Sequence, residues 1–448
     1  MTFSLPEIAA AWNLAGVSCP PEPVSGWSVD SRSIAPRDLF FALRGPNHDG
    51  HKFVREVIAK GAAAAVVDRP VQAEGVLLQV PDVLEALQTL ARWARTRWGG
   101  QVVAVTGSAG KTTTKEVIAR LLGTAMPVGK STGNLNNHVG LPLSILRLPE
   151  EARVAVLEIG MNHAGEIRRL AGVARPDAGV VTNVGHAHME FFDSIEDVAR
   201  AKRELIEALP AHGVAVLNAD DPRVAGFREA HPGRTVTYGL SPGADFRAQD
   251  VEHRPDGVRF RLRDSLWFES PMAGAHNVLN LLAGIAVAAQ FGIEPAALQP
   301  AVRTLEAGDM RGRRFVHRGI TVLDDCYNSN PEAAGRMLDL LRAEPARRRL
   351  AVLGEMRELG RWSESLHREV GRQVAQGGID VLVGVRGAAS YVVAEALKAG
   401  MTHDAALFFE NPVEAGEFVR REARQGDAIL FKGSRGTRVE KALEALMK

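Results

Sequence analysis

Gln101-Val-Val-Ala-Val-Thr-Gly-Ser-Ala-Gly-Lys-Thr-Thr-Thr-Lys115 runs from an apolar strand pattern, through a turn bounded by two glycines, into a helix. Gly107 and Gly110 allow the backbone to turn tightly and to present its N–H groups to an anion. Lys111 adds a positive charge, and Thr112 adds a hydroxyl suited to a phosphate-bound Mg²⁺. The stretch therefore predicts a phosphate-binding loop at a helix N-terminus. Its expected nucleotide contacts are Gly107, Ser108, Ala109, Gly110, Lys111, Thr112 and Thr113.

The loop departs in its spacing from the most familiar phosphate-binding pattern. That pattern has four residues between its glycines, whereas only Ser108 and Ala109 separate the glycines here, and Val105 stands where the first glycine would be. This spacing argues against a generic nucleotide kinase or GTPase. The alternative is an ordinary strand-to-helix turn rich in small residues, but strand, glycines, Lys-Thr pair and helix follow in the order that phosphate binding requires.

Length and net charge limit the classes of protein to which the chain can belong. A chain of 448 residues suggests three domains of about 150 residues each. The formal net charge of +1, with 24% charged residues, provides no basic surface for nucleic acid. A small-molecule partner is therefore expected.

Cysteine usage and the first residues bear on the compartment. Cys19 and Cys326 are far apart in sequence and lack metal-ligand spacing, so neither a disulfide framework nor a zinc site is expected. Residues 1–7 lack a basic start followed by an apolar core, and no apolar run reaches the roughly 18 residues of a spanning helix. These patterns predict a cytoplasmic protein without membrane insertion, which we expect to be a monomer.

Residues 1–98 are predicted to form a small N-terminal α/β domain that binds substrate. A capping box, Ser4-x-x-Glu7, begins a short helix. A helix over 82–98, ended by Gly99 and Gly100, leads into the next domain. Strand patterns lie at 27–32, 38–43 and 64–67, with an amphipathic helix at 51–60.

Residues 99–313 are predicted to form a central ATP-binding domain around a parallel sheet of the P-loop ATPase type. Near-continuous apolar runs alternate with helical patterns, which is typical of a parallel sheet covered on both faces. These runs lie at 101–105, 153–158, 178–182 and 213–217. Shorter, more polar runs at 235–238 and 258–263 predict an antiparallel excursion, and an alanine-rich helix begins near Gly274.

Ligands of such sheets bind beyond the carboxyl ends of the strands. Several polar side chains follow these strand ends and are therefore candidates for the site. They are Glu158, Asn183, His186, His188, Asn218, Asp220 and Asp221.

Residues 314–448 show a second alternating series and are predicted to form a Rossmann-like C-terminal domain, without a glycine-rich dinucleotide fingerprint. Asp325 and Asn328, in the segment 324–331, are candidate ribose or base contacts, and Arg313 is a candidate phosphate ligand. The alternatives are an Asx-rich turn and one exposed arginine among many. The strand patterns lie at 320–323, 350–353, 381–383, 407–409 and 428–431.

The helix predicted over 194–209 carries a lysine within its apolar stripe. Lys202 lies four residues after Val198 and three before Leu205. A desolvated amine has a lowered pKa, and its neutral form reacts with carbon dioxide to give a carbamate, which is a carboxylate-like Mg²⁺ ligand. The alternative is a lysine at the edge of the stripe whose amine reaches water.

Glu158 and His188 also allow two interpretations each. An acid after a buried strand is often a helix cap, and a histidine near Phe191 and Phe192 is often a hydrogen-bonded core residue. Mg²⁺ prefers oxygen ligands. Together with Thr112 at one sheet edge, the two residues predict a site for two cations around a triphosphate.

A set of segments that spans the chain resembles the Mur ligases, which also use the short glycine spacing. Asp30-Ser-Arg32, Gly45 and Asp49-Gly-His51 extend the resemblance to the N-terminus. Cys326 and Ser329 stand where serine and alanine are common in the family. The matching segments are Gly-Ser-Ala-Gly-Lys-Thr-Thr-Thr-Lys at 107–115, Gly-Asn-Leu-Asn-Asn-His-Val-Gly-Leu-Pro at 133–142, Thr-Asn-Val-Gly-His-Ala-His at 182–188, Ala-Lys-Arg-Glu at 201–204, Gly-Ala-His-Asn-Val-Leu-Asn at 274–280, Asp-Asp-Cys-Tyr-Asn-Ser-Asn-Pro at 324–331 and Leu-Gly-Glu-Met-Arg-Glu-Leu-Gly at 353–360.

The resemblance implies roles for individual residues. It implies that Lys111 and Thr112 serve the ATP phosphates and Mg²⁺, that Glu158 and His188 are metal ligands, and that Lys202 is carbamylated. Further residues match family positions that contact the adenine, the nucleotide from the C-terminal domain, the uridine end and the substrate-side loop: Asn277, Asn280, Arg313, Asp325, Ser31, Arg32, Asn136 and Asn137.

The resemblance also implies an activity. It implies an ATP-dependent, ADP-forming amide ligase that uses two Mg²⁺ ions and an acyl-phosphate intermediate in peptidoglycan precursor synthesis. The segments 324–331 and 353–360 favour joining of D-alanyl-D-alanine to UDP-N-acetylmuramoyl-tripeptide. No Asp-Asn-Pro-Arg motif, expected of the diaminopimelate- or lysine-adding member, is present.

The sequence also allows two rival functions. A folylpolyglutamate synthase would share the short loop and the carbamylated lysine, but the N-terminal Asp30-Ser-Arg32 pattern argues against it. A catalytically silent binding protein or nucleotide switch would keep the fold without ligation. The presence of Lys111, Glu158, His188 and Lys202 argues against that alternative.

Overall fold

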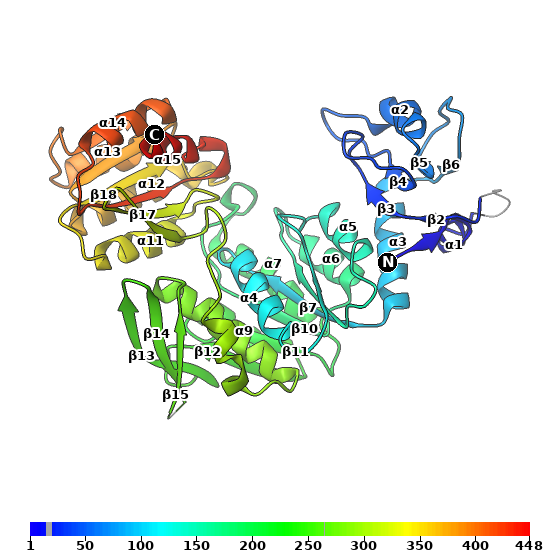
Figure 1. The fold of residues 1–448 in the computed structure, drawn as a ribbon, viewed down its shortest axis with the longest axis horizontal. Coiled ribbons are helices and arrows are strands. Elements are labelled where there is room, and N and C mark those ends of the chain that lie inside the picture. Colours follow the sequence, from blue (N-terminus) through cyan, green and yellow to red (C-terminus); the bar gives the residue numbers. More distant parts are fainter. Residues whose placement is uncertain (15–19, 264) are drawn as a thin grey trace.

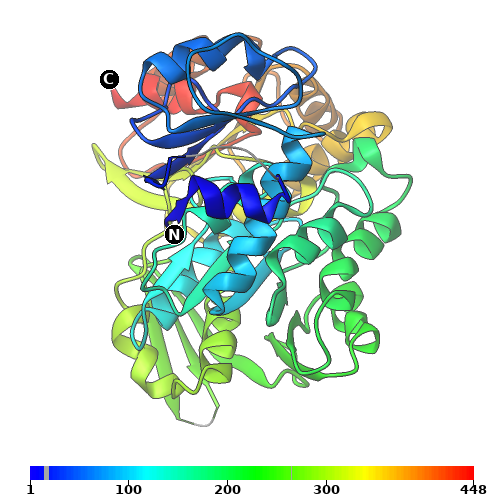
Figure 2. The same cartoon turned by 90° about the vertical axis from the view of Figure 1, so that its right-hand side faces the viewer.

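The computed structural model describes residues 1–14, 20–263 and 265–448, so Cys19 lies outside the described part. Three larger sheets, each at the centre of one unit of the chain, and one pair of short strands are found there. The N-terminal and C-terminal units lie on opposite sides of the central unit (Figure 1), and the turned view shows both over the same end of it (Figure 2). The predicted three-part α/β fold class is confirmed.

The N-terminal unit is built on a parallel sheet with the order β3-β4-β5-β6. The Ser4 hydroxyl accepts a hydrogen bond from the Glu7 N–H, which confirms the predicted capping box. The strands and helices are β1 (Phe3–Ser4), α1 (Leu5–Ala11), β2 (Pro23–Val24), β3 (Gly26–Ser28), β4 (Asp38–Phe41), η1 (Gly50–Phe53), α2 (Val54–Ala59), β5 (Ala64–Val67), β6 (Leu77–Gln79) and α3 (Val83–Trp98).

Two sequence expectations for this unit need correction. The strand predicted over 27–32 ends at Ser28, because the Asp30 carboxylate accepts hydrogen bonds from the backbone N–H and the guanidinium of Arg32 and turns the chain. The helix predicted over 51–60 begins as the 3₁₀ turn η1. The strand β6 lacked a clear alternating signal and was not predicted.

The central unit holds a nine-stranded sheet with the order β15-β14-β13-β12-β11-β10-β7-β9-β8. Pairings from β8 to β13 are parallel, and those of β13 with β14 and of β14 with β15 are antiparallel. The strands are β7 (Gln101–Thr106), β8 (Val128–Lys130), β9 (Val154–Glu158), β10 (Ala178–Val181), β11 (Val214–Asn218), β12 (Arg234–Gly239), β13 (Phe246–Arg254), β14 (Gly257–Leu262) and β15 (Leu266–Ser270).

The antiparallel excursion begins later than predicted. Residues 235–238 lie in β12, which is parallel to β11, so their assignment to the excursion is wrong. The helical turns α8 (Pro222–Gly226) and η3 (Phe227–Ala230) supply the crossover that a parallel connection needs. The prediction holds for β14, which contains 258–262.

Alternate side chains of β7 enter different cores, as a sheet covered on both faces requires. Val102 and Ala104 join the core under α5 (Gly140–Leu146), α6 (Glu166–Ala174) and α7 (Ile195–Glu207). Val103 and Val105 join the core under α4 (Lys111–Leu122) and α9 (Ala275–Gln290). The helices of the unit are α4 (Lys111–Leu122), α5 (Gly140–Leu146), α6 (Glu166–Ala174), η2 (Met189–Phe191), α7 (Ile195–Glu207), α8, η3, α9 (Ala275–Gln290), η4 (Pro295–Leu298) and α10 (Gln299–Val302).

The C-terminal unit has a six-stranded sheet with the order β16-β17-β21-β18-β19-β20, parallel except for the edge strand β16. All five strands predicted from the sequence are present. The elements are β16 (Arg313–His317), β17 (Ile320–Asp325), α11 (Pro331–Ala343), β18 (Arg349–Gly354), η5 (Gly360–Trp362), α12 (Ser363–Gln376), β19 (Val381–Val385), α13 (Ala389–Lys398), β20 (Ala406–Phe409), α14 (Pro412–Glu422), β21 (Ala428–Lys432), η6 (Arg435–Thr437) and α15 (Glu440–Met447).

The order of the central sheet determines where a ligand can bind. The chain leaves β7 for β8 and β9 on one side, and then returns to β10 and β11 on the other side. Ligands of open α/β sheets bind at such a reversal of strand order, beyond the carboxyl ends of the strands. The loop at 107–110 lies at this position.

No helix in the described ranges is long and apolar enough to cross a membrane.

Candidate active site

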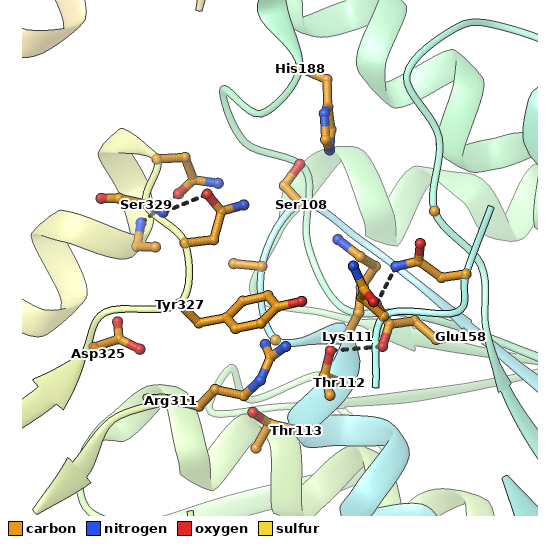
Figure 3. A pocket seen from close by; sticks show the side chains of 18 of the residues that line it. Ser108, Lys111, Thr112, Thr113, Glu158, His188, Arg311, Asp325, Tyr327 and Ser329 are labelled. Carbon is orange, nitrogen blue, oxygen red and sulfur yellow. Dashed lines mark hydrogen bonds between the residues drawn. The ribbon is translucent and has the colours of Figure 1, made fainter. Parts of the chain in front are cut away.

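A cavity of about 440 Å³ lies beyond the carboxyl ends of β7 and β9. Side chains from the central unit and from the start of the C-terminal unit line it together (Figure 3). The predicted site residues that line it are Ser108, Ala109, Gly110, Lys111, Thr112, Thr113, Asn136, Asn137, Glu158, His188, Asn277, Asn280, Asp325 and Asn328.

The loop between β7 and α4 needs its two glycines. Gly107 has φ +150° and Gly110 has φ +81°. A Cβ atom at Gly107 would lie 1.9 Å from the Thr182 hydroxyl oxygen, and one at Gly110 would lie 2.8 Å from Oδ1 of Asn280. The loop therefore packs against neighbours on both sides, with its backbone free to approach a ligand.

The residues after β10 hold the loop in place. Asn183 accepts the Ala109 N–H through Oδ1 at 2.9 Å and the Ser108 N–H through its carbonyl oxygen at 3.0 Å. The Ser108 hydroxyl donates to the Gly185 carbonyl at 2.9 Å. Asn183, predicted from its place at a strand end, thus supports the loop.

Lys111 begins α4 and reaches back over the loop. Its ammonium donates to the Gly107 carbonyl at 2.8 Å. Burial lowers the pKa of Lys111, while the nearby Glu158 and Glu358 carboxylates oppose that shift. An ammonium has three N–H groups, so this side chain can bind an anion in the cavity as well.

Glu158 is held by neighbours on both sides of its carboxylate. The Thr112 hydroxyl donates to Oε2 at 2.7 Å, and the Asn136 amide donates to Oε1 at 2.7 Å. The Glu158 side chain belongs to a residue only 3% exposed. Because Glu158 ends β9 and accepts from these two side chains, the helix-cap interpretation is wrong.

His188 lies at the junction between the central and C-terminal units. It has a left-handed backbone with φ +62°, and its Nδ1 lies 2.6 Å from Oε2 of Glu358. Burial lowers the pKa of His188, and Glu358 opposes that shift. This contact leaves Nε2 of the ring available to another ligand.

Lys202 is 1% exposed on α7. Among the residues that the structure describes, its amine has no hydrogen-bond or ion-pair partner. Burial lowers the pKa of Lys202 well below its ordinary value, and the charge of Lys111 adds to the shift. The alternative of a lysine reaching water at the stripe edge is therefore wrong, although Lys202 is not among the residues that line the cavity.

The asparagines of α9 form a buried chain behind the loop. Thr114 donates to Oδ1 of Asn280 at 3.0 Å, and Nδ2 of Asn280 donates to Oδ1 of Asn277 at 3.0 Å. Nδ2 of Asn277 in turn donates to the Ala273 carbonyl at 2.8 Å. These bonds fix the asparagines on the wall where the resemblance implies adenine contacts.

The C-terminal unit contributes a charged pair, and its Tyr327 stacks with Arg311 from the segment that leads into it. The Lys432 ammonium lies 2.5 Å from Oδ2 of Asp325 and donates to the Asn328 carbonyl at 2.9 Å. The Arg311 guanidinium lies 3.8 Å from the ring centroid of Tyr327 (Figure 3). In the sequence, the scarcity of lysine and the glycine-flanked loop Lys432-Gly-Ser-Arg435 indicate Lys432, whereas no local signal indicates Arg311 or Tyr327.

Several predicted residues lie outside the cavity. Arg313, in β16, is exposed and has its Nη1 3.5 Å from Asp309, whereas Arg311 lines the cavity. Ser31 and Arg32 lie in the N-terminal unit. Arg32 pairs with Asp30 at 2.6 Å, and its hydrogen bonds lower the pKa of Asp30 to about 2.

The donor set suits an oxygen-preferring metal ion. The described residues contain no group of three or more His, Cys, Asp or Glu side chains placed to hold a metal by themselves. Thr112 and Glu158 nevertheless present a hydroxyl and a carboxylate side by side on the wall of the cavity. Mg²⁺ is typically held by one or two carboxylates plus phosphate oxygens and water, so these residues fit a phosphate-bound Mg²⁺.

Comparisons with known proteins agree along the whole chain. Residues 23–96 match the Mur ligase family, catalytic domain; residues 105–288 match the Mur ligase middle domain; and residues 310–435 match the Mur ligase, glutamate ligase domain. The UDP-N-acetylmuramoyl-tripeptide–D-alanyl-D-alanine ligase of Bacillus subtilis is 36% identical over 432 residues, which cover 95% of this chain and 93% of the relative.

Solved structures give the same result. MurF from Acinetobacter baumannii superposes with a TM-score of 0.92 at 31% identity, covering 100% of this chain and 99% of that chain. MurF ligase from Thermotoga maritima, solved in complex with ADP, superposes with a TM-score of 0.85 at 28% identity, covering 95% of this chain and 97% of that chain.

Proposed function

The chain belongs to the Mur ligase family, and from that premise we propose that it is an ATP-dependent, ADP-forming ligase that joins D-alanyl-D-alanine to UDP-N-acetylmuramoyl-tripeptide. The observation that carries this proposal is the 36% identity to a ligase of that name over 95% of the chain. The cavity supports it, because the phosphate loop, Glu158 and the C-terminal Asp325 face one space.

The proposed chemistry has two steps. The terminal carboxylate of the tripeptide attacks the γ-phosphorus of ATP in line, and ADP leaves with the bonding electrons, which gives an acyl phosphate. The amine of D-alanyl-D-alanine then attacks the acyl carbon and displaces phosphate. Both steps depend on positioning and on neutralising charge rather than on covalent catalysis by the protein.

The residues at the loop would serve the first step. The N–H groups of 107–110 and the Lys111 ammonium would bind the phosphates. Thr112 and Glu158 would hold Mg²⁺, with His188 and a carbamate of Lys202 as the further ligands of a two-metal site. Bound Mg²⁺ supplies positive charge that lets two anions approach each other.

The remaining residues would hold the two ends of the substrates. Asn277, Asn280 and Asp325 would contact the nucleoside, and Arg311, which lines the cavity, is better placed than Arg313 to reach a phosphate. Residues proposed for the UDP-tripeptide are Ser31, Arg32, Asn136, Asn137 and Asn328.

The organisation of the chain belongs to the same proposal. We assign residues 1–98, 99–313 and 314–448 to substrate-binding, ATP-binding and Rossmann-like domains, in a cytoplasmic monomer. Ser31 and Arg32 lie outside the cavity in the described arrangement. The domains would therefore have to close for both ends of the substrate to be held and for water to be kept from the acyl phosphate.

The activity can be tested by phosphate release from purified protein with ATP, Mg²⁺ and UDP-N-acetylmuramoyl-tripeptide, with and without D-alanyl-D-alanine. We expect release that depends on the dipeptide and a product larger by one dipeptide in mass spectrometry. A folate substrate with glutamate serves as the parallel reaction for the folylpolyglutamate rival. Phosphate release that is the same with and without D-alanyl-D-alanine contradicts the proposal, as does release that occurs only with the folate substrate and glutamate.

A further inference from the structure

Lys115 is a buried lysine one turn after Lys111 on α4, and the proposed chemistry does not use it. Its side chain is 0% exposed, and its ammonium donates to the Ser131 carbonyl oxygen at 2.7 Å. The ammonium also lies 3.2 Å from Oε1 of Glu116. Lys115 is not among the residues that line the cavity, whereas Thr112, three residues earlier on α4, is.

Ser131 links this lysine to Glu158. Ser131 is also 0% exposed and directly follows the short edge strand β8. Its N–H donates to the Val156 carbonyl at 3.1 Å, and its hydroxyl oxygen accepts the Glu158 N–H at 3.1 Å. The Lys115 ammonium is thus joined through one residue to the backbone of Glu158.

The first two turns of α4 therefore hold Glu158 at two points. Thr112 contacts the carboxylate directly, and Lys115, three residues later on the same helix, contacts the residue that binds the Glu158 N–H. Ser131 also begins the loop that brings Asn136 to the other carboxylate oxygen. β8 is an edge strand that pairs only with β9, so its other contacts come from side chains such as Lys115 and Lys130, which reach between it and α4.

Packing alone does not explain a lysine at this position. An ammonium loses its hydration when it is buried, and that loss is only offset by well-placed acceptors. A methionine would fill a similar volume without this penalty. Filling space therefore does not account for a charged side chain here, and the contacts of its ammonium do.

We propose that Lys115 is a positioning residue for Glu158, acting through Ser131 to set the carboxylate for the metal ion that accompanies the nucleotide. The inference rests on the proposed metal role of Glu158. Partners behind a metal ligand typically change metal affinity by about 10–100-fold when they are removed. Loss of Lys115 should therefore weaken metal binding at the loop while leaving nucleotide contacts in place.

The test measures binding without turnover. Mn²⁺ is titrated into the protein with ADP, and free Mn²⁺ is followed by its electron paramagnetic resonance signal. Lys115→Met should weaken Mn²⁺ binding about tenfold. Affinity for ADP in the presence of EDTA, measured by calorimetry, should remain close to that of the unsubstituted protein, because a general collapse of α4 would weaken it as well.

A second variant keeps the test decisive if Lys115→Met does not fold. Ser131→Ala removes the acceptor of the Glu158 N–H and leaves the carbonyl that Lys115 binds. It should also weaken Mn²⁺ binding. Where both variants fold, the double variant should lose little more Mn²⁺ affinity than the weaker-binding single variant. The reason is that both substitutions interrupt the same chain of contacts from Lys115 through Ser131 to Glu158.

Lys130→Met is the matched control. Lys130 pairs with the same Glu116 and precedes Ser131, but it does not hold the Ser131 carbonyl, so its loss should change Mn²⁺ affinity by less than about twofold. Two results would overturn this inference and leave the proposed metal role of Glu158 standing. One is unchanged Mn²⁺ affinity in Ser131→Ala, and the other is a double variant whose loss of Mn²⁺ affinity equals the sum of the two single losses. If the unsubstituted protein binds no Mn²⁺ beyond that held by ADP, the proposed metal role is overturned and this inference with it.

Discussion

Lys111 and Lys202 are both buried lysines near the phosphate loop, but their amines have different surroundings. Burial lowers the pKa of Lys111, but its ammonium donates to the Gly107 carbonyl and has the Glu158 carboxylate nearby, and both contacts favour the charged form. Lys202 has no described partner, and the charge of Lys111 acts against its protonation. The first is therefore suited to bind an anion, and the second is suited to react as a neutral amine.

Lys111→Ala should abolish most of the turnover and leave the fold intact. The substitution removes the positive charge that faces the transferred phosphoryl group, and loss of one such group typically lowers kcat by about 10²–10³-fold. Phosphate release measures the rate, and thermal unfolding measures the fold. Lys441→Ala, at an exposed pair with Glu444, is the control; a near-normal rate in Lys111→Ala would show that the loop is not the phosphate site.

Lys202→Ala should be inactive and partly rescued by a small carboxylate such as acetate. The expected reason is that a carbamate of Lys202 places negative charge beside Mg²⁺, and a free carboxylate can enter the space left by the side chain. The measurement is phosphate release as a function of acetate concentration, with chloride at equal ionic strength as the control. Native-like activity of Lys202→Ala without acetate would exclude the carbamate role.

Lys202→Met should raise the unfolding temperature in buffer free of carbon dioxide. Burial holds the folded pKa of Lys202 below the value of about 10.4 expected in the unfolded chain. Between the folded and the unfolded pKa, the unfolded state therefore binds more protons than the folded state. The loss in the free energy of unfolding caused by burying Lys202 is complete below the folded pKa, and it disappears as pH rises towards the unfolded pKa. The gain should be larger near pH 6.5 than near pH 9.5 (about three pH units apart); a gain that grows with pH would contradict this reasoning.

At the scale of elements, the strand β7, the loop and α4 act as one unit whose geometry depends on glycine. Gly107 lies in a backbone region that favours glycine, and its neighbour Thr182 leaves no room for a methyl group. The same loop is bonded to Asn183 after β10. The loop is therefore shaped by the element beside it as well as by its own sequence.

Gly107→Ala should weaken nucleotide binding and destabilise the protein by about 1–3 kcal/mol, because both the backbone and the Thr182 contact must shift. Gly172→Ala is the matched control: Gly172 lies inside α6 with nothing within 4 Å of an added Cβ, and alanine there should stabilise by about 0.5–1 kcal/mol. ADP affinity and denaturant unfolding measure the two effects. Equal ADP affinity and equal unfolding free energy in the two variants would show that the loop tolerates a side chain at Gly107.

At the scale of the molecule, the loop at 185–193 is one of the places where the C-terminal unit contacts the central one, beside the packing of α11 on α9. Glu332, in the first turn of α11, accepts the His186 N–H at 3.0 Å and lies 2.6 Å from Nδ1 of the same histidine. Arg361 of η5 donates to the Asp193 carbonyl at 3.1 Å. The contact at His188 belongs to the same surface, so the cavity and the arrangement of the units are coupled.

Glu332→Gln should loosen this arrangement. A hydrogen bond to a charged group is worth about 1.5–3 kcal/mol when buried and less when half exposed, as here, so a shift of a few-fold in the population of the described arrangement is expected. Fluorescence energy transfer between dyes on the C-terminal and central units measures the distance distribution. Glu364→Gln, which breaks an exposed pair with Arg368 on α12, is the control and should leave that distribution unchanged. If Glu332→Gln gives the same distance distribution as the unsubstituted protein, the contact between Glu332 and His186 does not hold the two units in place.

Local signals accounted for much of the fold and for the loop itself. Near-continuous apolar runs predicted most parallel strands of the central and C-terminal sheets, because side chains of neighbouring residues enter cores on opposite faces. The edge strands β8, β15 and β16, and β13, were not predicted. The capping box at Ser4 and the glycines at 107 and 110 are likewise local requirements of the backbone. The predicted antiparallel direction of residues 235–238, in β12, was wrong. Pairing direction depends on the crossover through α8 and η3 and not on the strand's own residues.

The sequence by itself determined the phosphate loop, the three-part α/β architecture and, through resemblance, the family. Only the tertiary structure decided which side chains face one another: it brought Arg311 rather than Arg313 to the cavity, joined Lys115 to Glu158 through Ser131, and set Glu358 against His188. Spacing along the chain reports backbone conformation, which is local. Contacts between residues far apart depend on how the sheets and helices pack, and no local pattern encodes that packing.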